Sequence, residues 1–354
     1  MWRRLAMKFC VDFDTGDMIR CWVVPDNPIA ISRIVIKIDG RRNVPLEASL
    51  TEDAFRAMGW HSTGQCAFHI TEAHVPGLPQ LSHLEIYEAD TNVLLYRRKP
   101  AAECVQRRLL LINTSVNPET ALQGMLFRHF QQSSFGIGAM SEEILKSTLE
   151  GRALSSCFLS GALSIPRYEH LFPPDLMLST ALIHDPHVEM ATRLCWLRDR
   201  AEAAADPGRR WRLGRLAEAA AFTTEYDLAD VKSLKRLFRM LPEPAYHFLY
   251  NPLTRQFGTR LPDDRVHPGN SIVAIEILAR VGIVGHRSYF EAFATTLLDE
   301  LGIQDTVPKP DPIPAEVLAL ADRLRGVKAV ADMLVFDIAM ADAVLSSVSK
   351  SWSR

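Results

Sequence analysis

Residues 109–126 combine an apolar run, a sharp turn and a helix start, the arrangement of a strand that leads into an anion-binding loop. Asn117 predicts the N-cap of the helix and Pro118 its first residue, because Asn accepts a first-turn hydrogen bond and Pro needs no donor there. The free N–H groups and positive dipole end of such a helix attract an anion. Glu119 already supplies a carboxylate, and residues 113–120 contain neither Lys nor Gly. The pattern indicates a nucleotide-site architecture without phosphate-holding residues, although such a helix start also occurs in proteins without a ligand.

Two further polar clusters each have a functional and a structural interpretation. His184 and Asp185 precede Pro186, so they can form a binding site at a strand end, or Asp185 can cap the following helix. Arg167 and His170 can present an acid–base surface to a sugar, or they can belong to a solvated loop of mixed charge. No pair of histidines has the helical i, i+4 spacing of a metal site. We therefore expect no metal site.

The first hundred residues favour an all-β module, because short runs rich in β-branched residues alternate with turn signals. These runs are 19–24, 31–38 and 84–89. Asp39 and Gly40 predict a hairpin turn, since both tolerate the positive backbone dihedrals that a tight turn requires. We expect a small sandwich over residues 1–103, in which Trp22 and Trp60 either stack on sugar rings or lie in the core.

Residues 104–354 predict an α/β domain, because short apolar strands alternate with longer helices. Strands are expected at 109–113, 157–163 and 178–184, and their continuous apolar character is typical of a buried parallel sheet. Helices are expected at 186–205, 227–240, 271–281, 289–301, 315–324 and 327–348. The Pro-rich residues 307–314 predict a stiff connector between two of these helices.

The composition is that of a globular protein with a sizeable core, with 47% hydrophobic and 23% charged residues in 354. A net charge of -2 argues against a nucleic-acid partner, and the basic residues 209–212 are expected on a solvated helix face. Six singly spread cysteines indicate neither a zinc cage nor a disulfide framework and favour reduced thiols in a cytoplasmic protein. The basic residues 1–4 precede no long apolar run, so we expect no secretory signal and no transmembrane segment.

Five short motifs follow one another in residues 107–302. They are Ser115-Val-Asn-Pro-Glu-Thr-Ala121, Ser160-Gly-Ala162, His184-Asp-Pro186 with Thr192, Asn251-Pro-Leu-Thr-Arg255 and Val281-Gly-Ile-Val-Gly285. Their order resembles that in membrane-type and bacterial carbohydrate sulfotransferases, which use 3′-phosphoadenosine 5′-phosphosulfate. Each motif alone is weak, and the collinear series carries the resemblance. It implies a P-loop-NTPase-like sulfotransferase fold, a parallel sheet flanked by helices, after the β module.

The resemblance also implies a donor site. The positions that match its donor-binding residues are Asn117, Thr120, His184, Asp185, Thr192 and Arg255. Val116 replaces the family's loop Lys, and Pro118 with Glu119 replaces its two loop glycines. Ala162 replaces the histidine that the resemblance implies as a base, and His184 replaces the Arg for the 3′-phosphate. Losing one preorganised contact to a transition state costs on the order of 3 kcal/mol, so these combined departures favour lost catalysis.

Three functions remain open. The first is a non-catalytic sulfotransferase-like protein with a binding or assembly role in bacterial surface-polysaccharide metabolism and a saccharide or protein partner. The second is a divergent carbohydrate sulfotransferase in which Arg167, Arg255 and His184 replace the lost cations. The third is a structural interaction protein whose nucleotide cleft is closed by packed side chains, with Val116 filling the loop. Because of these departures, no residue is predicted to be catalytic. The cofactor 3′-phosphoadenosine 5′-phosphosulfate is expected only if the protein is a divergent sulfotransferase.

Overall fold

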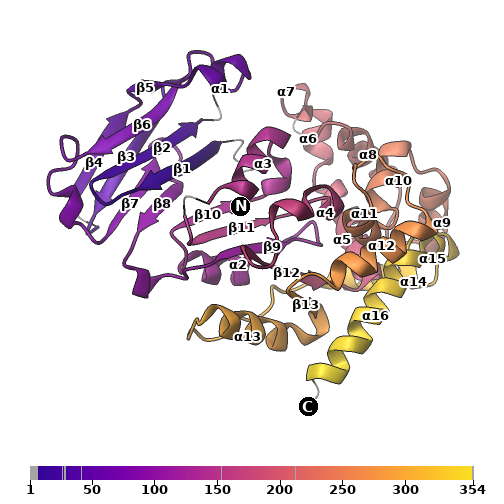
Figure 1. The fold of residues 1–354 in the computed structure, drawn as a ribbon. Coiled ribbons are helices and arrows are strands. Elements are labelled where there is room, and N and C mark those ends of the chain that lie inside the picture. The colour runs from indigo at the N-terminus through magenta and orange to yellow at the C-terminus, as the bar shows by residue number, and fades with distance from the viewer. Residues whose placement is uncertain are drawn as a thin grey trace.

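The computed structural model describes residues 7–25, 27, 29–40, 42–152, 154–211 and 213–352. Figure 1 shows an antiparallel β part at one end (indigo), a parallel sheet in the middle and a largely helical part toward the C-terminus. Residues 1–4 and Arg212, which carry part of the predicted basic segments, lie outside the described residues. Within the described ranges, no helix has both the length and the apolar character needed to cross a membrane.

Two four-stranded antiparallel sheets form the N-terminal part, with strand orders β1-β2-β6-β5 and β4-β3-β7-β8. The strands are β1 Lys8–Asp14, β2 Met18–Val24, β3 Arg33–Ile38, β4 Arg42–Glu47, β5 Leu50–Thr51, β6 Gln65–Thr71, β7 Leu84–Glu88 and β8 Leu94–Arg98, and the short helix α1 spans Asp53–Ala57. Ile19 and Phe68 from the first sheet share one core with Ile34 and Ile86 from the second. This shared core makes the two sheets a sandwich, as the alternating pattern predicts.

The predicted hairpin at Asp39 and Gly40 is confirmed. The strands on either side pair antiparallel, with Ile38 opposite Arg42. Asp39 has a φ of 49° and Gly40 a φ of 66°, both in the left-handed region. Two consecutive positive dihedrals match the twist of the flanking strands, which explains why this residue pair stands at the turn.

A five-stranded sheet of order β10-β11-β9-β12-β13 forms the centre, and every pair in it is parallel. Its strands are β9 Arg108–Ile112, β10 Gln132–Phe135, β11 Cys157–Gly161, β12 Met177–Ile183 and β13 Ile283–His286. Leu109 and Leu111 face α2 (Thr120–Phe127) and α13 (Phe290–Leu301). Leu110 and Ile112 pack on the opposite face. Helices cover both faces, and the three predicted strands, β9, β11 and β12, are buried along their whole length. β10 was not predicted, because its residues Gln-Ser-Ser-Phe are mostly polar.

The second face of the sheet is covered by α3, α11, α12 and α16. The helices not yet bounded are α3 Glu142–Glu150, α4 Ile165–Tyr168, α5 Pro186–Arg198, α6 Ala201–Ala205, α7 Pro207–Arg210, α8 Leu216–Thr223, α9 Val231–Arg239, α10 Glu243–Leu249, α11 Pro252–Gly258, α12 Pro268–Leu278, α14 Ala315–Arg325, α15 Lys328–Met333 and α16 Val335–Trp352. α5 packs against α8 and α14, away from the sandwich, so the helical part extends beyond the sheet (Figure 1).

Two predicted helices are wrong in their continuity. The expected helix 186–205 is interrupted after Arg198, and the expected helix 327–348 is divided at Leu334. At the second break, the Asn251 side chain accepts hydrogen bonds from Phe336 N at 3.0 Å and Asp337 N at 3.1 Å. A side chain more than 80 residues away in the chain therefore caps a new helix start, a contact that local periodicity does not reveal.

Candidate functional site

The loop that follows β9, residues 113–119, is tied to the neighbouring strands at the carboxyl edge of the parallel sheet. Asn113 N donates to Gly161 O at 2.9 Å, and the Thr114 hydroxyl donates to Leu182 O. Val116 N donates to the buried carboxylate of Glu189 at 3.2 Å. These contacts from β11, β12 and α5 fix the backbone of the loop and thereby the start of α2.

The predicted helix start at Asn117 and Pro118 is wrong. α2 begins at Thr120, and Glu119 is its N-cap residue, with no side-chain hydrogen bond of its own to the helix. Asn117 is exposed, and its backbone N–H donates to Ser115 Oγ at 3.2 Å. The first N–H groups of α2 are instead satisfied from a distant part of the chain.

Asp311 supplies that distant partner. Its carboxylate accepts hydrogen bonds from Thr120 N, from the Thr120 hydroxyl at 2.6 Å and from Ala121 N at 3.2 Å. The carboxylate therefore lies at the positive end of α2, in the position where such a helix start attracts an anion. This placement is the central feature of the candidate site.

Asp311 belongs to residues 307–314, which we call the strap. The strap connects α13 to α14 without a helix or strand and contains the prolines that predict a stiff connector. Glu119 accepts a hydrogen bond from Asp311 N at 2.8 Å. Arg287, which follows β13, pairs with the Glu119 carboxylate and donates to Asp311 O. The strap is thus held at α2 through both its backbone and its side chain.

Val116, the position that the resemblance aligns with a loop lysine, carries a packed apolar side chain. Val116 packs against the apolar cluster that includes Trp196, Leu197 and Ala217. This contact places the Val116 side chain between α5 and α8. The loop consequently places no cation of its own at the start of α2.

Gly161, in the Ser160-Gly-Ala162 motif, has a structural reason to be glycine. A Cβ atom there would lie 2.7 Å from Ile137 N, closer than packed atoms allow. Ser160 donates to Asn113 Oδ1 at 3.1 Å and accepts from Gln123 Nε2 at 2.7 Å. The Ser160 side chain therefore joins β11 to the loop through Asn113 and to α2 through Gln123.

His184 lies at the end of β12 near Arg287 and His286. Burial, followed by the positive charge of Arg287 and by His286, lowers the pKa of His184 to about 3. The ring is neutral at pH 7, so it carries no charge for a phosphate. The permanent cation beside it, Arg287, is already paired with Glu119.

Asp185 caps α5, which confirms the structural interpretation of this residue. Its carboxylate accepts hydrogen bonds from His187 N at 2.9 Å and Val188 N at 3.0 Å. Although burial opposes it, hydrogen bonding from Val188 and the charge of Arg325 lower the pKa of Asp185. The Arg325 guanidinium pairs with the same carboxylate at 3.0 Å.

Thr192 and Arg255 direct their polar atoms to the backbone. The Thr192 hydroxyl donates to Val188 O, one turn earlier in α5, at 2.8 Å. Arg255 donates to Pro262 O at 3.0 Å and to Asp264 O at 2.6 Å. Burial lowers the pKa of Arg255, and these carbonyls fix its guanidinium on the loop that follows α11.

The two predicted substrate-binding residues lie on the short helical segment after β11. Arg167 pairs with Glu142 of α3, and its guanidinium lies 5.6 Å from the centre of the Tyr168 ring. His170 is exposed. The neighbouring Glu169 pairs with Arg280 at 2.5 Å. This surface of alternating charges matches the solvated-loop interpretation of the segment.

The residues at the sheet edge do not fit 3′-phosphoadenosine 5′-phosphosulfate. The start of α2 is satisfied by Asp311, and Arg287 beside it is paired with a carboxylate. Of the predicted donor residues, Thr120 meets Asp311, and His184 lies beside Arg287. Asn117, Thr192 and Arg255 contribute no side-chain contact to this cluster among the described residues.

Sequence reasoning missed Asp311 and Arg287, because the residues that meet at α2 are separated by more than 160 positions. The only local signal was the absence of Lys and Gly in the loop, which indicates that something other than a phosphate satisfies the helix start. Within the described ranges, no three His, Cys, Asp or Glu side chains are grouped to hold a metal ion. All six cysteines are free thiols.

Compared with protein-family models, curated proteins and solved structures, the chain matches none of them.

Proposed function

We propose that this chain is a sulfotransferase-like protein with a closed donor site, which acts as a non-catalytic binding or assembly component in bacterial surface-polysaccharide metabolism. The donor-site part of this proposal is supported by the carboxylate of Asp311 at the start of α2. The polysaccharide context is supported by the resemblance of the motif series alone.

The closed site is supported by the way the strap is attached. An anion that approached α2 would have to displace Asp311, which is held as part of the same chain, and would then face the buried carboxylate of Glu119. A tethered group competes at a high effective concentration, so it excludes a free ligand of similar intrinsic affinity. The packed side chain of Val116 provides no compensating cation.

The alternative of a divergent active transferase requires cations that converge from new positions. Arg167 is paired with Glu142 on a surface of alternating charges, and Arg255 is bound to backbone carbonyls. His184 is neutral at pH 7 because burial and Arg287 lower its pKa. None of the three replaces the missing lysine at α2, so no observation favours this alternative.

The test is calorimetric titration with adenosine 3′,5′-bisphosphate, the product that reports on the donor site without an acceptor. We expect no heat and no thermal shift at millimolar ligand. Binding in the micromolar range, worth roughly 8 kcal/mol, would overturn the proposal and support the divergent transferase. An Asp299→Asn variant serves as the matched control for variants of Asp311, because Asp299 is an exposed carboxylate on the helix before the strap.

A further inference from the structure

Helix α9 carries four cations on a single side, which we call the cationic stripe. Lys232, Lys235, Arg236 and Arg239 stand at positions i, i+3, i+4 and i+7, the spacing that lines one face of a helix. All four side chains are exposed. The stripe extends from Lys232 to Arg239, about 10 Å along the helix axis.

The opposite face of α9 is buried in the helical part. Leu234, Leu237 and Phe238 pack in the cluster that also contains α14 and α15 residues. Asp230 caps the helix by accepting from Lys232 N at 3.2 Å and Ser233 N at 2.9 Å. The helix is therefore fixed, and its cations are presented on a rigid surface rather than on a loop.

The cationic stripe has no ion-pair partner in the part of the chain that the structure describes. Other exposed arginines of the helical part do have one, as Arg209 pairs with Asp206 at 2.5 Å and Arg215 with Asp263 at 3.1 Å. Four adjacent unpaired cations repel one another, and an anionic ligand relieves that repulsion. The overall net charge of -2 makes this local excess of positive charge more distinctive.

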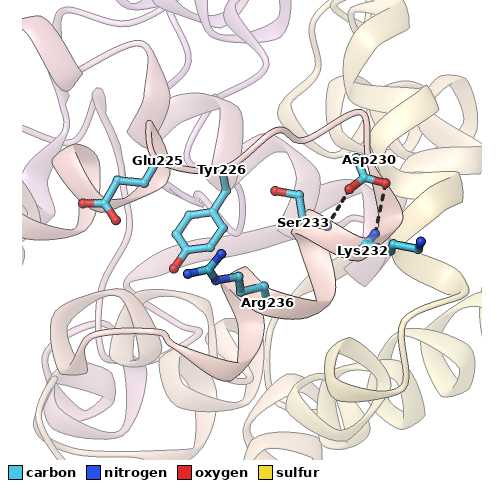
Figure 2. Close-up of a pocket in the computed structure, with 6 residues that line it drawn as sticks. All are labelled: Glu225, Tyr226, Asp230, Lys232, Ser233 and Arg236. Atoms are coloured by element: carbon cyan, nitrogen blue, oxygen red, sulfur yellow. Dashed lines mark hydrogen bonds between the residues drawn. The ribbon is translucent and has the colours of Figure 1, made fainter.

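A cavity of about 360 Å³ adjoins the stripe and offers a different chemistry. It is lined by Glu225, Tyr226, Asp230, Lys232, Ser233 and Arg236 (Figure 2). The Arg236 side chain extends toward the Tyr226 ring, and Glu225 lies on the far side of that ring (Figure 2). The Ser233 oxygen accepts from Asp227 N at 2.9 Å, which leaves its hydroxyl hydrogen free to donate.

We propose that the cationic stripe and this cavity form a binding site for an acidic saccharide chain. Carboxylate or sulfate groups of the saccharide meet the four cations, while its hydroxyl groups pair with the carboxylates and the serine of the cavity. Cations and carboxylates side by side suit a ligand whose negative charges are spaced apart by hydroxyl-bearing rings. The choice of a saccharide rests on the proposed function, whereas the anionic character rests on α9 alone.

Two other polyanionic partners fit this surface less well. A nucleic acid carries closely spaced phosphates, which would lie against Glu225 and Asp230. An anionic membrane binds amphipathic helices through an apolar face, and that face of α9 is buried inside the protein. Both remain useful as competitors in the test.

The experiment measures binding of alginate oligosaccharides, a uronate chain, to the full-length protein by calorimetry at low salt, with neutral dextran as the comparison. The test variant carries Lys232→Gln, Lys235→Gln, Arg236→Gln and Arg239→Gln. We expect alginate to bind the unmodified protein. We expect the variant to bind alginate about tenfold more weakly, since each exposed ion pair contributes modestly. Glutamine keeps the helix propensity, and a thermal melt verifies folding.

A matched control neutralises four exposed cations that are spread over other surfaces, by Arg42→Gln, Arg152→Gln, Arg260→Gln and Lys350→Gln. This variant has the same net charge as the test variant and should bind alginate as the unmodified protein does. Equal binding by both variants, or equal binding of dextran and alginate, would overturn the proposal. A DNA duplex or anionic vesicles bound as tightly as alginate would overturn the saccharide assignment. The bisphosphate titration tests the donor site at α2, and the alginate titration tests α9. Failure of one proposal can therefore be distinguished from failure of the other.

Discussion

At the residue scale, Asp311 gives the start of α2 the negative partner that a helix N-terminus attracts. Its two carboxylate oxygens meet two consecutive backbone N–H groups and one hydroxyl, while Glu119 and Arg287 hold the strap backbone. The same donors would contact a phosphate if the loop were open. An internal carboxylate thus stands where the resemblance implies a ligand.

Replacing this carboxylate should destabilise the protein. In Asp311→Ala, the N–H groups of Thr120 and Ala121 lose their partner, and we expect a loss of about 1–2 kcal/mol, the usual cost of removing a helix cap. Urea unfolding measures the change. Asp299→Asn should stay within about 0.5 kcal/mol of the unmodified protein, as exposed substitutions generally do. An Asp311→Ala protein as stable as the control would contradict the capping role.

His184 should make the protein less stable in mild acid. Its pKa is about 3 in the folded state and near 6.5 when unfolded, so the unfolded state takes up a proton first as the pH falls. The stabilisation is complete above pH 6.5 and is lost progressively toward pH 3, by about 2 kcal/mol between pH 7 and pH 5. Unfolding by urea at several pH values should show a flatter dependence for His184→Gln. His170→Gln, an exposed control, should retain the slope of the unmodified protein.

Residues with local partners were predictable, and residues with distant partners were not. Asp185 caps the helix that begins one residue later, so its role follows from the Asp-Pro step itself. Asn117 also precedes a proline, so the local sequence predicts a cap there as well. However, Asp311 accepts from the first N–H groups of α2 from 190 residues away, and α2 begins at Thr120, three residues after Asn117. The prediction that Glu119 supplies the carboxylate at the start of α2 is wrong, because Asp311 supplies it and Glu119 binds the strap.

At the element scale, α11 and α16 cap one another. Asp337 of α16 accepts from Leu253 N at 2.9 Å and Thr254 N at 2.7 Å at the start of α11. Asn251, which precedes α11, accepts from Phe336 N and Asp337 N at the start of α16. Asn251 adopts a left-handed φ of 41° to reach this position. The exchange fixes two of the helices that cover one face of the parallel sheet.

Removing one member of this exchange should be costly. Asp337→Ala leaves two buried N–H groups without acceptors, and each such group costs about 1–3 kcal/mol. We expect a loss of about 2–4 kcal/mol in the free energy of unfolding, measured with urea. Asp342→Ala, an exposed position on the same helix, should change stability little. Equal effects of both substitutions would mean that the exchange does not stabilise the protein.

β9, β11 and β12 could be predicted because burial on both faces leaves a mostly apolar run. β10 could not, because its residues Gln-Ser-Ser-Phe are mostly polar. The division between α15 and α16 could not, since the apolar periodicity continues across Leu334 and only the Asn251 side chain marks the new start. Element type follows from local pattern. Element ends follow here from contacts between segments far apart in the chain.

At the scale of the whole molecule, the sandwich is joined to the central sheet through main-chain contacts. Arg97 N of β8 donates to Gln131 O, which directly precedes β10, at 2.8 Å. The Arg97 guanidinium also donates to Arg128 O at 3.3 Å and lies 5.3 Å from the Phe127 ring centre. This junction connects β8 to the start of β10. We therefore expect the sandwich and the central sheet to unfold together.

Arg97→Ala should weaken this coupling. The substitution removes the side-chain contacts to Phe127 and Arg128 and also the ion pair with Glu85 of β7. We therefore read the coupling from β3, which Arg97 does not contact, and expect it to lose about 1 kcal/mol of protection relative to β9 and β12. Hydrogen exchange followed by mass spectrometry measures both groups of strands. Arg33→Ala is the control, because Arg33 pairs with Asp90 inside the sandwich. Protection that changes equally in both variants would argue against a coupling role for Arg97.

The change from antiparallel to parallel pairing between β8 and β9 was predictable, because strands separated by turns give way there to strands that alternate with helices. The position of the strap was not predictable. Its proline content indicates stiffness, but where a stiff segment is attached depends on partners such as Arg287 that lie elsewhere in the sequence.

The most direct test of the closed site is a pair of crystal structures, of the unmodified protein and of Asp311→Ala, both determined in concentrated sulfate. We predict no anion at Thr120 N and Ala121 N in the unmodified protein, with the Asp311 carboxylate in that place, and a sulfate on the same donors in the variant. A sulfate at α2 in the unmodified protein, with the strap displaced, would contradict the account.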